Sequence, residues 1–132
     1  MAQTNPLAPL LIRIGLGSIL FFHGLQKLLY ISRTIEFFQL IELPAPPIAA
    51  YVIATAEILC GIAFFLGIHI RLASLCTILL MCGTIITVKG TKGFINGYEF
   101  DVLIMLNAIS LIFLGPGEHS ISHISNQPYG NT

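Results

Sequence analysis

Residues 48–68 read IAAYVIATAEILCGIAFFLGI and contain a single charged side chain, that of Glu57. An apolar run of roughly 20 residues is the length that an α-helix needs to cross the ~30 Å hydrocarbon core of a bilayer. Pro44, Pro46 and Pro47 precede the run and mark a turn. This stretch therefore predicts a transmembrane helix with one carboxylate near its centre.

The composition of the whole chain agrees with a membrane protein. Of the 132 residues, 55% are hydrophobic and 9% are charged, whereas a soluble domain carries about 25% charged residues. The formal net charge is zero and no basic block is present, so the charge pattern does not favour a nucleic-acid partner. The length allows one compact unit. We therefore expect a single integral membrane domain over residues 1–132, with the lipid bilayer as its solvent.

Further apolar runs complete the predicted fold. The expected membrane spans lie at about 7–30, 48–68, 72–89 and 100–115, followed by a disordered or interfacial tail at 116–132. The short connection at residues 67–71 makes the second and third spans antiparallel neighbours. Between the first two spans, Thr34–Ile41 fits a short interfacial helix with Phe37, Phe38 and Leu40 facing lipid. The predicted fold class is all-α, a four-transmembrane-helix bundle with short loops.

The distribution of Lys and Arg predicts an orientation. An even number of crossings places both termini on the same side of the membrane. The loop side carries four basic residues, Lys27, Arg33, Lys89 and Lys92, and the terminus side carries Arg13 and Arg71. Because cytoplasmic loops are enriched in Lys and Arg, this count favours external termini.

Charged residues inside the spans carry the most information, because each costs at least ~2.5–3.5 kcal/mol at mid-depth unless it is paired or hydrated. Glu57 needs a cation from another helix. At 100° per residue, one narrow arc of the first helix holds Arg13, Gly17, Gly24 and Lys27, with His23 at its border. The second helix carries a matching stripe of Ala50, Ala54, Glu57 and Gly61. Small residues pack membrane helices closely, so we expect the two stripes to face each other.

The direction of the side chains ranks the partners of Glu57. Side chains lean toward the N-terminus of their own helix, so His23 and Lys27 lean toward mid-membrane and Arg13 leans away. We predict that Glu57 meets His23 first and Lys27 second, and that Arg13 pairs with Glu57 only if water enters from the terminus side. Two interpretations of the cluster remain open. It is either a structural ion pair that fixes helix order or a protonatable site for a quinone, a proton or a polar substrate.

The segment Gly93–Asp101 joins the last two spans and carries two acidic side chains. Glu99 and Asp101 place negative charge at a helix N-terminus, which the helix dipole favours. This capping role is sufficient for Asp101. Glu99 is a candidate to close over the His23 end of the bundle, because Lys27 and Arg33 lie on the same side.

Other residues that could carry chemistry favour simpler interpretations. The three cysteines, Cys60, Cys76 and Cys82, lie in apolar runs without a spacing that implies a pair. His119 and His123 have the spacing of a helical metal pair, but they lie in the predicted tail, so no metal site is expected. Asn107 and Ser110 are assigned to hydrogen bonding between helices.

A series of short pieces resembles a known family. The pieces are Arg13, His23-Gly24 with Lys27, Pro44-Ala45-Pro46, Ala56-Glu57 with Gly61, Leu66-Gly67 with Arg71, Gly93-Phe94, Gly97-Tyr98-Glu99, and Gly115-Pro116-Gly117 with Ser120. In their order and spacing they resemble the DoxX family of small bacterial membrane proteins, from about Leu11 to Ser120. The resemblance implies a four-helix fold in the bacterial cytoplasmic membrane. One local departure is Glu118–Ser122, where the family often has a Tyr-Ser-Leu-Asp-like segment.

The resemblance also suggests a function. The family takes its name from association with a thiosulfate:quinone oxidoreductase, and some members are linked to membrane oxidoreductase complexes that handle thiol or oxidative stress. We therefore expect a membrane-embedded subunit of a redox system that binds a quinone or relays protons, with no cofactor held by the chain itself. A membrane oxidoreductase or a second copy of the chain is the expected partner. The alternatives are a non-enzymatic scaffold or assembly partner, and a carrier for a small or lipidic solute.

The candidate site residues follow from the cluster and from the acidic loop. Catalytic candidates are His23, Glu57 and Lys27. Ligand-binding candidates are Arg13, His23, Lys27, Glu57 and Glu99. The absence of a recognisable cysteine pair argues against direct dithiol chemistry in this chain.

Overall fold

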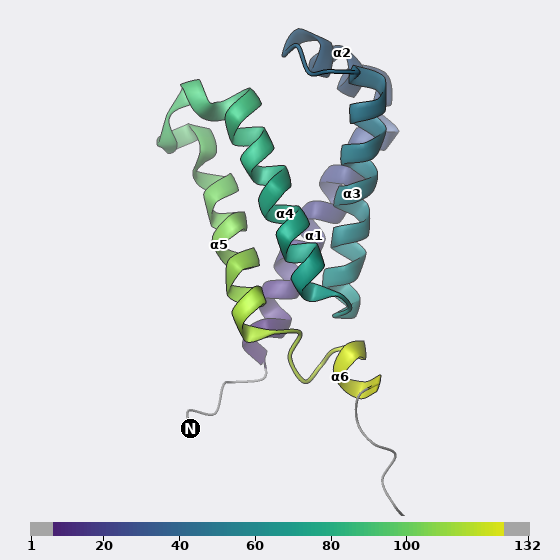
Figure 1. Ribbon diagram of the computed structural model, residues 1–132, viewed down its shortest axis with the longest axis vertical. Helices are drawn as coiled ribbons and strands as arrows, with labels where there is room; N and C mark the ends of the chain where they lie inside the picture. Colours follow the sequence, from purple (N-terminus) through teal and green to yellow (C-terminus); the bar gives the residue numbers. More distant parts are fainter. Residues whose placement is uncertain (1–6, 126–132) are drawn as a thin grey trace, which may run out of the picture.

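The computed structural model describes residues 7–125, and within this range the chain forms helices and turns without strands (Figure 1). Within the same range, four helical segments are long and apolar enough to cross a membrane: Leu7–Leu29, Pro46–Leu66, Ile70–Lys92 and Phe94–Leu114. The predicted all-α fold with four spans is therefore confirmed. The part of the predicted tail at 126–132 lies outside the described residues.

The elements follow one another as α1 (Leu7–Leu29), α2 (Ile31–Leu40), α3 (Pro46–Leu66), α4 (Ile70–Thr84), the π-helical turn η1 (Ile85–Lys89), the 3-10 turn η2 (Gly90–Lys92), η3 (Phe94–Tyr98), α5 (Glu99–Leu114) and α6 (Ile121–Ser125). α4 continues through η1 and η2, so the third span extends to Lys92. Ile95 and Asn96 interrupt η3 with non-helical backbone angles. Asn96 has a φ of 58°, which Asn tolerates better than most residues, and the chain turns there into α5.

The helices form two antiparallel pairs, α1 with α3 and α4 with α5. Figure 1 shows the pairs spreading apart toward the end that holds α2 and converging toward the end that holds α6. We call these the loop end and the terminus end of the bundle. α1 crosses behind the bundle, so its first half also contacts α5.

Glycines set the close approach of α1 to α3, as the facing stripes predict. A Cβ built on Gly17 would lie 3.1 Å from the Gly61 carbonyl oxygen, and one on Gly24 would lie 2.6 Å from the Ala54 carbonyl oxygen. A Cβ on Gly61 would lie 2.8 Å from the backbone nitrogen of Phe21. Each neighbour is backbone, which cannot rotate away. The predicted contact between the two stripes is confirmed.

Gly24→Ala is expected to destabilise the protein by about 1–3 kcal/mol, because the added methyl group forces the backbones of α1 and α3 apart. The matched control is Gly15→Ala on the same helix, where a Cβ meets nothing within 4 Å. The midpoint of thermal unfolding in detergent, followed by circular dichroism, should fall for Gly24→Ala alone. Equal midpoints for the two variants would contradict the assignment.

Two predictions about side-chain contacts are corrected. α2 is a helix as expected, and Leu40 is 81% exposed, but Phe38 is buried at 6% exposure. Phe38 lines the space between α2 and the bundle instead of facing lipid. Asn107 and Ser110 donate to the Leu103 and Leu106 carbonyls of their own helix, at 2.8 and 2.9 Å, so within residues 7–125 their hydrogen bonds lie inside α5 and not between helices.

The described part of the tail is docked under the bundle, not disordered. Ser120 is 1% exposed, and the Ser122 hydroxyl donates a 2.8 Å hydrogen bond to the Gly67 carbonyl in the α3–α4 turn. Gly67 has a φ of 70°, and a Cβ there would collide with Ser120 and lie 2.6 Å from a guanidinium nitrogen of Arg13. The tail was expected to be disordered or interfacial, and the contacts of Ser120 and Ser122 exclude disorder for its described part. It is ordered by groups from distant helices.

Candidate functional site

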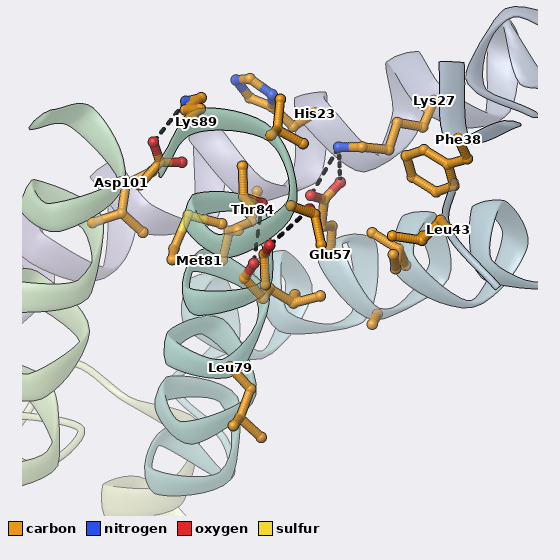
Figure 2. Close-up of a pocket in the computed structure, with 18 of the residues that line it drawn as sticks. His23, Lys27, Phe38, Leu43, Glu57, Leu79, Met81, Thr84, Lys89 and Asp101 are labelled. Atoms are coloured by element: carbon orange, nitrogen blue, oxygen red, sulfur yellow. Dashed lines mark hydrogen bonds and ion pairs between the residues drawn. The ribbon is translucent and has the colours of Figure 1, made fainter. Parts of the chain in front are cut away.

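A cavity of about 630 Å³ lies between the two helix pairs at the loop end. We call it the main cavity. Its walls come from the second half of α1, from α2 and the loop after it, from α3, from α4 with η1, and from the start of α5. Most of these side chains are apolar, and Phe38, Leu43, Leu79 and Met81 are among them (Figure 2). The polar exceptions are two ion pairs, a histidine and two threonines, Thr84 and Thr87.

The first ion pair joins α1 to α3. Lys27 Nζ lies 2.8 Å from Glu57 Oε1 and 2.6 Å from Glu57 Oε2, so it donates to both carboxylate oxygens (Figure 2). The carboxylate side chain is 7% exposed and the lysine side chain 24% exposed. A lone charge at this depth costs several kcal/mol, and pairing offsets that cost. The charges of Lys27 and Glu57 thus balance each other, but the pair still presents polar atoms to the cavity.

A second ion pair stands on the opposite wall and joins η1 to α5. Lys89 Nζ lies 2.6 Å from Asp101 Oδ2. The Asp101 side chain is only 5% exposed, and that of Lys89 is 27% exposed. Asp101 lies in the first turn of α5, as the sequence predicts, but favourable interaction with the helix dipole is not its only role, because its carboxylate also pairs with Lys89. The sequence contained a signal for this ion pair. Lys89 and Asp101 have opposite charges and lie at the ends of two spans that a short connection makes neighbours.

His23 lines the main cavity from α1, one turn before Lys27 (Figure 2). It is exposed, and among residues 7–125 no hydrogen bond joins it to Glu57. The prediction that Glu57 meets His23 first is therefore wrong. The reason is the close contact at Gly24, where a Cβ would lie 3.0 Å from the Glu57 Cβ. Because side chains lean toward the N-terminus, Lys27 leans back to the level of Gly24 and His23 leans past it.

The two remaining ligand candidates lie elsewhere. Glu99 is exposed and accepts a 3.1 Å hydrogen bond from the Asn96 backbone N–H, so it caps its own loop and does not close over His23. Arg13 lies at the terminus end, 1% exposed. Its guanidinium donates to four carbonyl oxygens, those of Phe64 at 2.8 Å, Phe65 at 2.9 Å, Pro116 at 2.8 Å and His119 at 3.0 Å. Arg13 therefore ties the end of α3 to the tail.

The structure also brings together two cysteines that the sequence spacing left unpaired. The thiols of Cys60 on α3 and Cys76 on α4 interact, and both are free. Cys76 lines the main cavity, whereas Cys60 belongs to the buried core. Sequence reasoning missed this contact because a turn of a few residues brings the two helices together in a register that spacing does not reveal. Within residues 7–125, no group of three or more His, Cys, Asp and Glu side chains is arranged to hold a metal ion.

Comparison with known proteins identifies relatives of this chain. The DoxX family model matches residues 8–90. A protein of Bacillus subtilis (strain 168), named "Putative oxidoreductase CatD", is 38% identical over 115 residues, which cover 87% of this chain and 84% of that protein. An uncharacterized membrane protein of Mycobacterium tuberculosis (strain ATCC 25618 / H37Rv) is 28% identical over 131 residues, covering 89% of this chain and 80% of that protein. No solved structure matches the chain.

The matched region contains α1, α3 and α4, and with them Lys27, Glu57 and Lys89. The relatives extend the similarity over most of the chain, and one of them is described as a membrane protein, in agreement with the four apolar spans. The chain is a multi-pass membrane protein that belongs to the DoxX family.

Proposed function

We propose that this protein is the membrane subunit of a redox system and holds a quinone head group in the main cavity. One observation carries the proposal: an apolar cavity between membrane spans contains two nearly buried carboxylates, each beside an ammonium group, on opposite walls. Its volume of about 630 Å³ lies in the usual range of small-molecule sites, about 300–1,000 Å³. The oxidoreductase name of the Bacillus relative supports a redox role.

The chemistry of a quinone suits this arrangement. A quinone has two carbonyl oxygens on opposite sides of an apolar ring, and its reduction to a quinol takes up two electrons and two protons. In the proposal, Lys27 and Lys89 donate hydrogen bonds to the two oxygens, one on each wall. Glu57 on one wall and Asp101 on the other each take up one proton that arrives from the loop-end surface and pass it to the nearer oxygen. His23 exchanges protons with the loop-end surface, because its side chain is exposed and also lines the main cavity.

The electrons come from a partner in this proposal. The partner is a membrane oxidoreductase that reduces the bound quinone, and this chain supplies the binding site and the protons. We place the complex in the bacterial cytoplasmic membrane with the loop end facing the cytoplasm, as the distribution of Lys and Arg favours.

Protection of Cys76 tests the proposal. A variant with Cys60→Ala and Cys82→Ala keeps Cys76 alone, on the wall of the main cavity. Tetramethylbenzoquinone, whose ring positions are all substituted and therefore do not add thiols, should slow labelling of Cys76 by a membrane-permeant thiol reagent. At ten times the dissociation constant, occupancy should reduce the rate by about tenfold.

The matched control keeps Cys82 instead, with Cys60→Ala and Cys76→Ala. Cys82 is half-buried on the same helix but does not line the main cavity. Its labelling rate should not change when the quinone is added. If the quinone leaves the Cys76 rate unchanged, or slows both cysteines equally, the main cavity is not a quinone site.

A further inference from the structure

A second, smaller cavity of about 310 Å³ lies between the first half of α1 and α5. We call it the side groove. Its lining residues are Leu11, Ile12, Gly15, Leu16, Ile19, Phe100, Leu103, Ile104 and Asn107. It runs along α1 from Leu11 to Ile19, a helical length of ~12 Å at 1.5 Å per residue.

The side groove adjoins the main cavity. Ile19, Phe100 and Ile104 line both cavities, so these three side chains form a boundary that the two spaces share. Asp101, whose carboxylate pairs with Lys89, lies between Phe100 and Ile104 on α5. A molecule with its polar end at Asp101 thus has an apolar path from the main cavity toward mid-membrane.

Gly15 keeps the side groove open. The glycines at 17, 24 and 61 are pressed against the neighbouring helix, whereas a Cβ on Gly15 would meet nothing within 4 Å. Gly15 therefore contributes nothing to the α1–α3 contact. Because Gly15 has no side chain, the groove is wider at this position. Its other walls are mostly aliphatic and aromatic side chains.

We propose that the side groove binds the isoprenoid tail of the quinone whose head group occupies the main cavity. The inference rests on the proposed function and adds the substrate class: a lipidic membrane quinone, not a short-chain soluble one. Continuity with the head-group site selects this occupant, because one molecule with a polar ring and a long apolar tail fills both spaces. Burial of each CH₂ group of the tail strengthens binding by about fourfold, so the groove accounts for a large part of the affinity.

The experiment compares two quinones with matched rings. Tetramethylbenzoquinone has no tail, and trimethylbenzoquinone with a geranyl tail carries one in place of a methyl group. The readout is the quinone concentration that halves the labelling rate of Cys76. Gly15→Phe fills the side groove and should raise this concentration about tenfold or more for the geranyl quinone. It should leave the value for tetramethylbenzoquinone unchanged.

The control is Ile14→Phe, the adjacent position on α1, which is 46% exposed and lines neither cavity. Ile14→Phe should leave the half-protecting concentration of both quinones unchanged. Leu103→Phe, on the facing wall of the groove, is the second filling variant and should repeat the result of Gly15→Phe if that variant does not fold.

The remaining outcomes overturn the inference. If Gly15→Phe and Leu103→Phe weaken the binding of both quinones equally, or weaken the binding of neither, the tail does not lie in the side groove. If the filling variants release a copurifying phospholipid and leave geranyl quinone binding unchanged, the groove holds a lipid acyl chain instead. If neither quinone protects Cys76 in the unfilled protein, the proposed function itself fails, and this result is distinct from a failure of the tail assignment alone.

Discussion

Arg13→Ala is expected to release the tail and to destabilise the protein by about 3 kcal/mol or more. Four carbonyl oxygens, from the end of α3 and from the tail, lose a charged donor at once. Each hydrogen bond to a charged group contributes about 1.5–3 kcal/mol, and some of that is recovered when water reaches the carbonyls. Arg13→Lys should rescue the stability only in part, because an ammonium group cannot match the fixed fork of the guanidinium.

Two measurements check this result. The midpoint of thermal unfolding in detergent should fall, and limited proteolysis should cut the chain after Gly115 faster than in the unchanged protein. Arg71→Ala is the matched control, because Arg71 lies at the same end of the bundle and is exposed. If Arg13→Ala behaves like Arg71→Ala, the carbonyl contacts of Arg13 do not stabilise the fold.

Glu57→Leu is expected to destabilise the protein by about 2–3 kcal/mol and to abolish quinone protection of Cys76. The variant leaves the Lys27 ammonium group without its counter-ion in an apolar cavity, and a lone lysine charge in a membrane helix costs about that much. This loss of stability is small for a buried ion pair, because the Lys27 side chain is 24% exposed and its ammonium group can reach water.

The double variant Lys27→Met with Glu57→Leu separates stability from function. Removing both charges should restore most of the lost stability, because apolar pairs replace buried ion pairs at little cost. The proposed function predicts that this stable protein still fails to bind tetramethylbenzoquinone, with at least about a tenfold rise in the half-protecting concentration. If the double variant binds the quinone normally, the pair is only a structural contact between α1 and α3.

The charged residues of this protein fall into two groups with different tasks. At the terminus end, Arg13 donates to backbone carbonyl groups and does not line the main cavity. At the loop end, two ion pairs face each other across that cavity. The helix pairs converge at the first end and diverge at the second, where the main cavity lies (Figure 1).

The sequence alone determined the solvent and the topology of this protein. Spans of roughly 20 apolar residues can be stable only in lipid, where each helix satisfies its own backbone. The glycine and alanine stripes also predicted the α1–α3 contact, because small residues are what permits close approach. These features are local in the chain or periodic along one helix, so no partner had to be known to recognise them.

Only the tertiary structure decided which charges meet. Helical periodicity placed His23 and Lys27 near Glu57, but their ranking depended on the axial register at Gly24, and the order His23 before Lys27 was wrong. The pairing of Lys89 with Asp101, the contact of Cys60 with Cys76, and the docking of the tail on Arg13 depend likewise on helix-to-helix register. A shift of one residue moves a side chain by about 1.5 Å along the axis and 100° around it. Packing between helices fixes that register, and the sequence of one helix does not contain it.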